Sequence, residues 1–245
     1  HADKLAESQE TGLSKPLSYQ IAGGVACGIV FALGSICQQW GLYLTTAGKT
    51  GFITTLYTIF VPLISWLFLK KKVKKQIWIG AILAVIGLFF ISAGSGFRLS
   101  MGDTVVFIGA IFFAMQIILT GHFVQYTSVL FLNMVQLATA ATISLIFSFL
   151  FEEGNSLNGM LEAAGIILYA GVVCIGIAYV CQGIGLKKAS PSVAAIILSF
   201  ESVFGAIFGA LILQERMSGY QLLGSGLIFA AIMIAQYERK ADINK

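Results

Sequence analysis

Residues 51–69, GFITTLYTIFVPLISWLFL, contain no charged side chain and end at the basic run KKKVKK of residues 70–75. A helix rises about 1.5 Å per residue, so about 20 such residues cross the roughly 30 Å of hydrocarbon in a bilayer. A transmembrane β-barrel would instead show alternating segments of about ten residues. The stretch therefore predicts a transmembrane helix, and the lysines predict the membrane surface at which it ends.

The rest of the chain repeats this pattern. Of its 245 residues, 58% are hydrophobic and 11% are charged, against about 25% charged in an ordinary soluble domain. We therefore predict an all-α, polytopic transmembrane helix bundle. Apolar runs bounded by charged or turn-forming residues predict eight helices, at residues 20–42, 50–69, 77–96, 104–121, 128–150, 161–186, 192–213 and 219–237.

The net charge is only +4, and the charged residues lie in clusters between the apolar runs. Both observations argue against a nucleic-acid partner. If the loops alternate between the two sides, Lys49, Arg98 and Arg216 fall on one side and the other 12 of the 15 Lys and Arg residues on the opposite side. The positive-inside rule makes that second side cytoplasmic, with both chain ends, and indicates a multi-pass protein of the cell or inner membrane. A lipid-binding or partner-binding patch is the alternative interpretation of the lysine run.

The sequence also contains an internal repeat. A shift of 144 aligns residues 37–90 with 181–234 without a gap, and ten of the 54 positions are identical, including the clusters CQQWGL and CQGIGL. An odd number of helices per repeat inverts its second copy, which places the loop at 70–75 inside and the loop at 214–219 outside. The repeat predicts a cytoplasmic segment at 1–19, the remainder of a first repeat at 20–96, a second repeat at 97–237 and a cytoplasmic tail at 238–245.

The same shift finds no partner for the two helices at 104–121 and 128–150. A complete duplication of five plus five helices would have two more helices ahead of residue 1, and we expect these in the full-length protein. The alternative is a natural eight-span protein with a processed start.

Two stretches resemble a known family: QQWGLYLTTAGKTGFITTLYTIFVPLISWLFLKKK with the following WIGAILAVIGLFFIS, and GLKKASPSVAAIILSFESVFGAIFGALILQERMSGYQLLGSGLIF. They are similar to the third to fifth and the ninth and tenth helices of the drug/metabolite transporter superfamily, EamA type. The resemblance implies ten helices, carriage or export of small metabolites and a central pocket between two repeats. Where the family often has Glu-Pro, this chain has Glu201 followed by Ser202, so a proline kink is not carried over.

Glu201 is the acidic residue that lies in the middle of a predicted span. An intramembrane carboxylate costs several kcal/mol unless it is protonated, paired or facing water. Glu201, Gly205 and Gly209 repeat every four residues, which predicts a carboxyl group on a close-packing face toward the bundle interior. We interpret it as a contact for a substrate amine or as a proton-coupling acid, with a neutral, hydrogen-bonded structural residue as the alternative.

Other polar side chains in the predicted spans are candidates for substrate binding. The repeat aligns Tyr57 with Glu201, and its phenol offers a hydrogen bond and an aromatic face. An amide side chain in an apolar span needs a hydrogen-bond partner. Tyr179 lies three residues before Gln182 and therefore shares a helix face with it. The alternative for all of them is structural hydrogen bonding or core packing. The remaining candidates are Gln38, Gln39, Gln116, Asn133, Gln136 and Gln182.

The motifs of other function classes are missing from the sequence. It contains no GxxxxGK[ST], HExxH or GxSxG, and its four cysteines and His122 have no metal-ligand spacing, so we expect no ATP hydrolysis, metal, cofactor or enzymatic activity. Gly24 and Gly28 predict tight helix packing, and Gly-rich faces would also suit a homodimer. The predicted function is a secondary exporter or exchanger of small organic metabolites, such as amino acids or drug-like compounds. A membrane scaffold or sensor is the alternative, and an integral-membrane enzyme is a weaker one.

Overall fold

The computed structural model describes residues 15–45, 47–70, 72–92, 100–151, 163–201, 203–204, 207 and 219–243. All regular secondary structure within these ranges is helical. Long apolar runs favour helices in a membrane because a helix satisfies its own backbone hydrogen bonds. Five helical stretches are long and apolar enough to cross a bilayer: Leu17–Leu44, Thr50–Leu67, Met101–Phe123, Val129–Phe151 and Ala164–Lys188. Two shorter apolar helices, Lys75–Phe90 and Leu222–Ile234, join them, so the chain is a multi-pass membrane protein.

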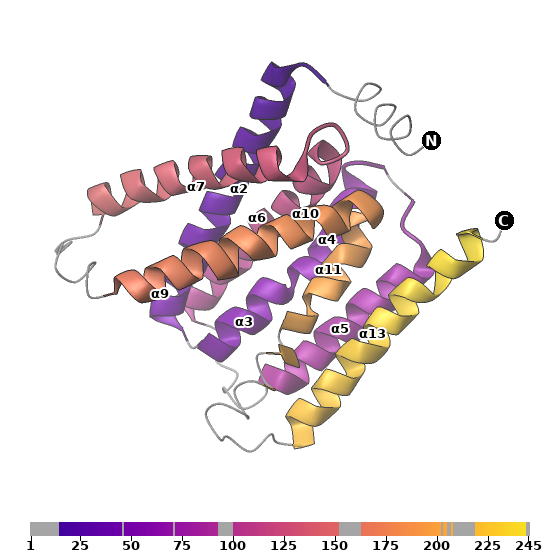
Figure 1. The fold of residues 1–245 in the computed structure, drawn as a ribbon. Coiled ribbons are helices and arrows are strands. Elements are labelled where there is room, and N and C mark those ends of the chain that lie inside the picture. Colours follow the sequence, from indigo (N-terminus) through magenta and orange to yellow (C-terminus); the bar gives the residue numbers. More distant parts are fainter. Residues whose placement is uncertain are drawn as a thin grey trace. The chain divides into compact units, whose positions relative to one another are not determined.

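The eight predicted helices all have counterparts in the described part of the chain (Figure 1). Two of them differ from the prediction because they are interrupted. The span predicted at 50–69 consists of two helices that meet at Leu56, and the span predicted at 161–186 contains a π-helical segment. The elements are α2 (Leu17–Leu44), α3 (Ala47–Thr55), α4 (Tyr57–Leu67), α5 (Lys75–Ser92), α6 (Met101–Phe123), α7 (Val129–Phe151), α9 (Ala164–Tyr169), η2 (Ala170–Ile177), α10 (Ala178–Lys188), α11 (Pro191–Leu198) and α13 (Gly219–Ile243).

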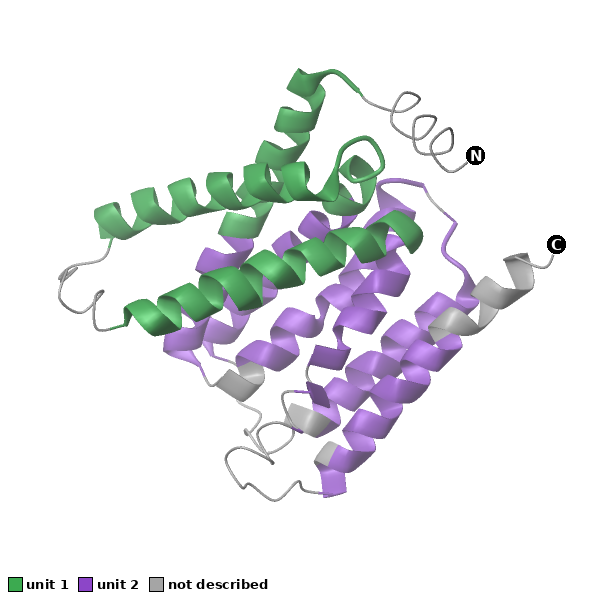
Figure 2. Ribbon diagram, viewed as in Figure 1, with its two compact units in different colours: residues 1–32, 119–189 green, residues 33–118, 190–245 purple. Residues whose placement is uncertain are grey.

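Contacts divide the chain into two units, shown in Figure 2. Unit 1 comprises residues 1–32 and 119–189, and unit 2 comprises residues 33–118 and 190–245. The helices α2 and α6 contribute residues to both units.

In unit 2, α5 and α13 lie side by side and run in opposite directions (Figure 1). Gly87 permits their close approach, since a Cβ atom at this position would lie 2.7 Å from the Gly224 carbonyl oxygen and 2.8 Å from Ile228 Cγ1. Ala84 and Ala231 are also fully buried in this packing. The two helices form the most extensive helix pair among the described elements and support the rest of unit 2.

In unit 1, the N-terminal half of α2 packs closely against α7. A Cβ atom on Gly24 would lie 2.6 Å from Val135 Cβ, and one on Gly28 would lie 2.6 Å from the Gln136 carbonyl oxygen. The interpretation of Gly24 and Gly28 as a tight helix-packing motif is therefore confirmed. At the start of α7, Val129 packs on Gly183 of α10, where a Cβ would lie 2.6 Å from Val129 Cγ1.

Candidate substrate site

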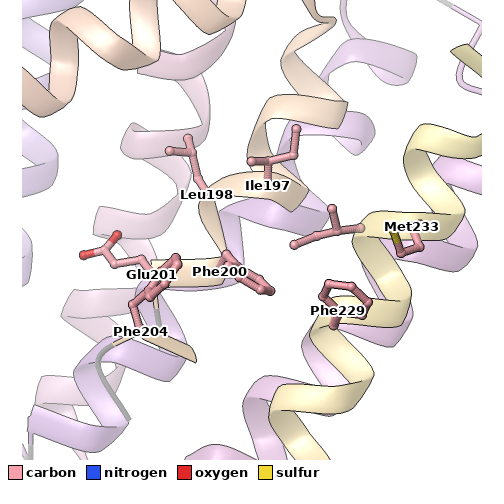
Figure 3. Close-up of a pocket in the computed structure, with 8 residues that line it drawn as sticks. Ile197, Leu198, Phe200, Glu201, Phe204, Phe229 and Met233 are labelled. Atoms are coloured by element: carbon pink, nitrogen blue, oxygen red, sulfur yellow. The ribbon is translucent and has the colours of Figure 1, made fainter. Parts of the chain in front are cut away.

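A cavity of about 500 Å³ lies in unit 2, between the end of α11 and α13 (Figure 3). A cavity of this size accommodates a small organic molecule. Seven of the eight side chains on its wall are apolar, and Glu201 is the charged one. The lining residues are Ile197, Leu198, Phe200, Glu201, Phe204, Phe229, Ile232 and Met233.

The local sequence of α11 explains how Glu201 reaches this wall. Ser190 caps the first turn by accepting a hydrogen bond from the Val193 amide at 3.4 Å, and Pro191 occupies the first turn, where its missing N–H is tolerated. Ser199, which is fully buried, donates its hydroxyl to the Ile196 carbonyl at 2.6 Å. Regular α11 ends at Leu198, and the residues that follow carry Glu201 to the edge of the cavity.

The Glu201 carboxylate and the Phe229 ring lie at different parts of the cavity wall (Figure 3). The Phe200 ring faces Phe229 of α13, with ring centroids 6.2 Å apart, and it contacts Phe204 at 5.2 Å. Figure 3 shows the Glu201 side chain directed away from Phe229 and Met233, and this residue is exposed. An exposed carboxylate beside an aromatic cavity suits a ligand with a cationic group and an apolar body.

The back of the cavity rests on the core of unit 2. Phe200 and Ile232 pack against a buried cluster formed by Leu88, Val203 and Ile228. This cluster joins α5 and α13 to the segment that carries Glu201. The α5–α13 pair therefore supports the segment that carries the carboxylate.

The other predicted site residues of unit 2 lie outside this cavity wall. Tyr57, the first residue of α4, is buried with 8% exposure, and Gln116 is buried with 1% exposure. Gln38 is half-buried and donates its Nε2 to Thr54 Oγ1 at 3.0 Å, whereas Gln39 is exposed. The predicted glycine partners of Glu201, at 205 and 209, lie outside the described residues.

The remaining predicted site residues belong to unit 1. Gln136 is buried and accepts a hydrogen bond from Thr120 Oγ1 at 3.3 Å, and the same hydroxyl lies 3.7 Å from the Cys27 sulfur. Tyr179 packs its ring on Phe31 with centroids 4.7 Å apart. Among the described residues, Asn133 Nδ2 and Gln182 Oε1 are buried without a hydrogen-bond partner.

Asp103 is a buried carboxylate that the sequence reasoning did not single out. It is 4% exposed and accepts hydrogen bonds from the Ser100 amide at 2.7 Å and from Thr45 Oγ1 at 2.6 Å. Ser100 Oγ accepts from the Asp103 amide in return, at 3.2 Å, so the pair caps the start of α6. The signal was the pattern Ser-x-x-Asp ahead of an apolar run, and its role is structural.

The apolar, membrane-crossing helices define a multi-pass membrane protein. The sequence profile of the EamA-like transporter family matches residues 8–93 and 100–236. The chain belongs to this family of non-enzymatic transporters, within the drug/metabolite transporter superfamily.

Individual relatives agree with this assignment. An uncharacterized transporter of Archaeoglobus fulgidus is 31% identical over 211 residues, which are 86% of this chain and 67% of the relative. The uncharacterized transporter YoaV of Bacillus subtilis is 25% identical over 199 residues, 80% of this chain and 68% of YoaV. Protein PecM of Dickeya dadantii is 24% identical over 219 residues, 88% of this chain and 72% of PecM. The chain thus spans about two thirds of the length of the first two relatives.

The fold has also been observed experimentally in another protein. A crystal structure superimposes with a TM-score of 0.74 at 19% sequence identity, covering 96% of this chain and 81% of that one. At this identity the likeness concerns the fold alone.

Proposed function

We propose that this protein is a secondary carrier that exports or exchanges small organic metabolites bearing an amine, such as amino acids or amine-containing drug-like compounds, across the cell membrane by alternating access. The observation that carries the proposal is the position of Glu201, a lone carboxylate on the wall of an apolar cavity of about 500 Å³. The chain has no nucleotide-binding P-loop motif, so an ion or substrate gradient supplies the energy.

Glu201 is suited to couple a proton to a substrate. A charged carboxylate within a span is costly unless water, a proton or a cation neutralises it. Among the described residues, the other carboxylates of the apolar helices lie near helix ends, as Asp103 does in the first turn of α6. Glu201 would bind a proton and a substrate amine in turn, so that release of one accompanies binding of the other.

An inverted repeat would supply the two alternating states, and three helix boundaries support it. Each boundary in the first half recurs 144 residues later in the second, as the sequence repeat predicts. The pairs are the ends of α2 and α10 at Leu44 and Lys188, the starts of α3 and α11 at Ala47 and Pro191, and the starts of α5 and α13 at Lys75 and Gly219.

The packing of α5 on α13 agrees with the same symmetry. These two helices occupy equivalent places in the repeat and run in opposite directions along each other (Figure 1). A two-fold axis in the membrane plane relates antiparallel equivalents in this way. In such carriers the two repeats rock around a fixed site, which here would contain Glu201.

Single-cysteine labelling from each side of the membrane tests the arrangement. In a background without the native cysteines, we expect an impermeant thiol reagent to label Lys72→Cys only from the cytoplasm and Gly219→Cys only from outside. Ile197→Cys, on the cavity wall, should react from both sides because the cavity opens alternately. Labelling of Lys72→Cys and Gly219→Cys from the same side would contradict the inverted repeat. An Ile197→Cys protein that reacts from one side only would contradict alternating access.

A further inference from the structure

A group of basic and aromatic side chains gathers at one end of unit 1. The Tyr19 hydroxyl and His122 Nε2 are hydrogen-bonded at 3.0 Å, in a direction that depends on the imidazole tautomer. The Tyr126 ring lies 5.3 Å from the His122 ring and 6.1 Å from the Tyr19 ring. Lys15 Nζ lies 5.9 Å from the centroid of the Tyr126 ring. These groups come from the start of α2, the end of α6 and the turn that follows it.

Two glutamines hold these segments together. Gln20 donates its Nε2 to the Lys15 carbonyl at 2.8 Å, and its Oε1 accepts from Thr127 Oγ1 at 2.6 Å. Gln125 donates to the Leu186 carbonyl at 3.1 Å, which brings the end of α10 to the same place. Lys187, exposed in the last turn of α10, follows Leu186 directly. We call Lys15, Tyr19, His122, Tyr126 and Lys187 the basic-aromatic cluster.

The basic-aromatic cluster has no acidic neighbour in the described part of its unit. Residues 15–32, 119–151 and 163–189 contain neither Asp nor Glu. The side chains of Lys15, His122 and Lys187 are exposed. A positive surface that also offers tyrosine hydroxyl and imidazole groups is complementary to an anion with several oxygen acceptors.

The position of the cluster along the helices restricts the source of that anion. Each segment that contributes to it lies at the end of a membrane-crossing helix: Leu17–Leu44 begins there, and Met101–Phe123 and Ala164–Lys188 end there. Tyrosines and lysines at such ends lie at the depth of the lipid headgroups. The phosphates at this depth belong to phospholipids, and basic pockets between helices bind anionic ones.

We propose that the basic-aromatic cluster is a binding site for the phosphate headgroup of an anionic phospholipid. Lys15 and Lys187 would supply the charge, and the hydroxyls of Tyr19 and Tyr126 would donate to phosphate or glycerol oxygens. The bound lipid would contact the ends of α2, α6 and α10 from the bilayer and hold them together. This proposal is independent of the proposed transport function, because lipid binding is measured with no transport substrate present.

Lipid retention by the purified full chain in detergent tests the proposal. The probes are phosphatidylglycerol and phosphatidylcholine with identical acyl chains, counted on the protein by native mass spectrometry. We expect the wild type to retain phosphatidylglycerol preferentially. Each lysine near an anionic surface contributes about 1 kcal/mol, a roughly fivefold change in affinity. The double variant Lys15→Ala/Lys187→Ala should therefore bind phosphatidylglycerol roughly 25-fold more weakly.

Two matched variants separate this site from general charge attraction. Lys72→Ala/Lys75→Ala removes the same charge from unit 2 and should leave retention unchanged. Lys15→Arg/Lys187→Arg keeps the charge and should also bind the lipid. Equal retention of the two lipids, or an equal loss in the unit 2 control, would overturn the proposal. Inorganic phosphate that displaces phosphatidylglycerol at millimolar concentration would show an anion site open to water, and would also overturn it.

Discussion

Replacing Glu201 by Gln is expected to abolish proton-driven transport while leaving the protein folded. The glutamine keeps the shape of the side chain but cannot ionise. Because Glu201 is exposed at the cavity edge, its loss removes no buried hydrogen bond that the structure shows. A positioned acid-base group contributes about 10²- to 10⁴-fold to a proton-transfer step, so uptake driven by a pH gradient should fall at least about 100-fold.

The measurement compares pH-gradient-driven uptake with substrate counterflow in the same vesicles. Counterflow moves no net proton, so it should survive in Glu201→Gln to a greater extent than driven uptake. Glu201→Asp is the matched control, since it retains an ionisable carboxyl group and should retain part of the driven uptake. Rates that are unchanged in both assays would make Glu201 a structural residue and direct attention to the amides Gln38, Gln116, Asn133 and Gln182.

A leucine in place of Gly87 should separate α5 from α13 and destabilise the protein. Its Cβ alone would lie 2.7 Å from the Gly224 carbonyl oxygen, a backbone atom that moves only with its helix. Overpacking of this kind typically costs about 1 to 3 kcal/mol, and a leucine in contact with backbone should fall at the upper end or beyond. In a protein of this size each kcal/mol corresponds to roughly 2 to 4 °C in Tm.

The control for Gly87→Leu is Gly185→Leu in α10, where a Cβ meets no atom within 4 Å. Leucine favours helix over glycine by about 0.5 to 1 kcal/mol, so this variant should be as stable as the wild type or slightly more stable. The Tm values of both variants and the wild type are measured in detergent, with size-exclusion chromatography as the readout of unfolding. Equal Tm values for Gly87→Leu and the wild type would contradict the close α5–α13 packing.

The helices were predictable from the sequence because a bilayer requires long, continuous apolar runs. The interruptions were not. Pro62, inside α4, cannot donate to the Thr58 carbonyl, but the helix boundary lies at Leu56, two turns earlier in the same span. The π-helical segment η2 consists of apolar residues that also suit an ordinary α-helix. The local sequence therefore reveals neither feature, since the same apolar residues also suit an uninterrupted helix.

The site was predictable only to the extent that charge is costly in a membrane. That cost singled out Glu201, which the structure places on a cavity wall. The sequence repeat aligned Tyr57 with it, yet Tyr57 does not line that cavity. The apolar partners Phe229 and Met233 come from α13, and nothing in their local sequence distinguishes them from lipid-facing residues. Contacts between distant helices decide which apolar side chains surround the carboxylate.

Efflux from proteoliposomes shows directly whether this protein is a carrier. Vesicles containing the full chain are loaded with a defined mixture of the twenty common amino acids and small organic amines, and the compounds released are identified by mass spectrometry. We expect at least one amine-bearing compound to leave faster than from protein-free vesicles, with a proton moving in the opposite direction. Release of every compound at the rate of protein-free vesicles would contradict it.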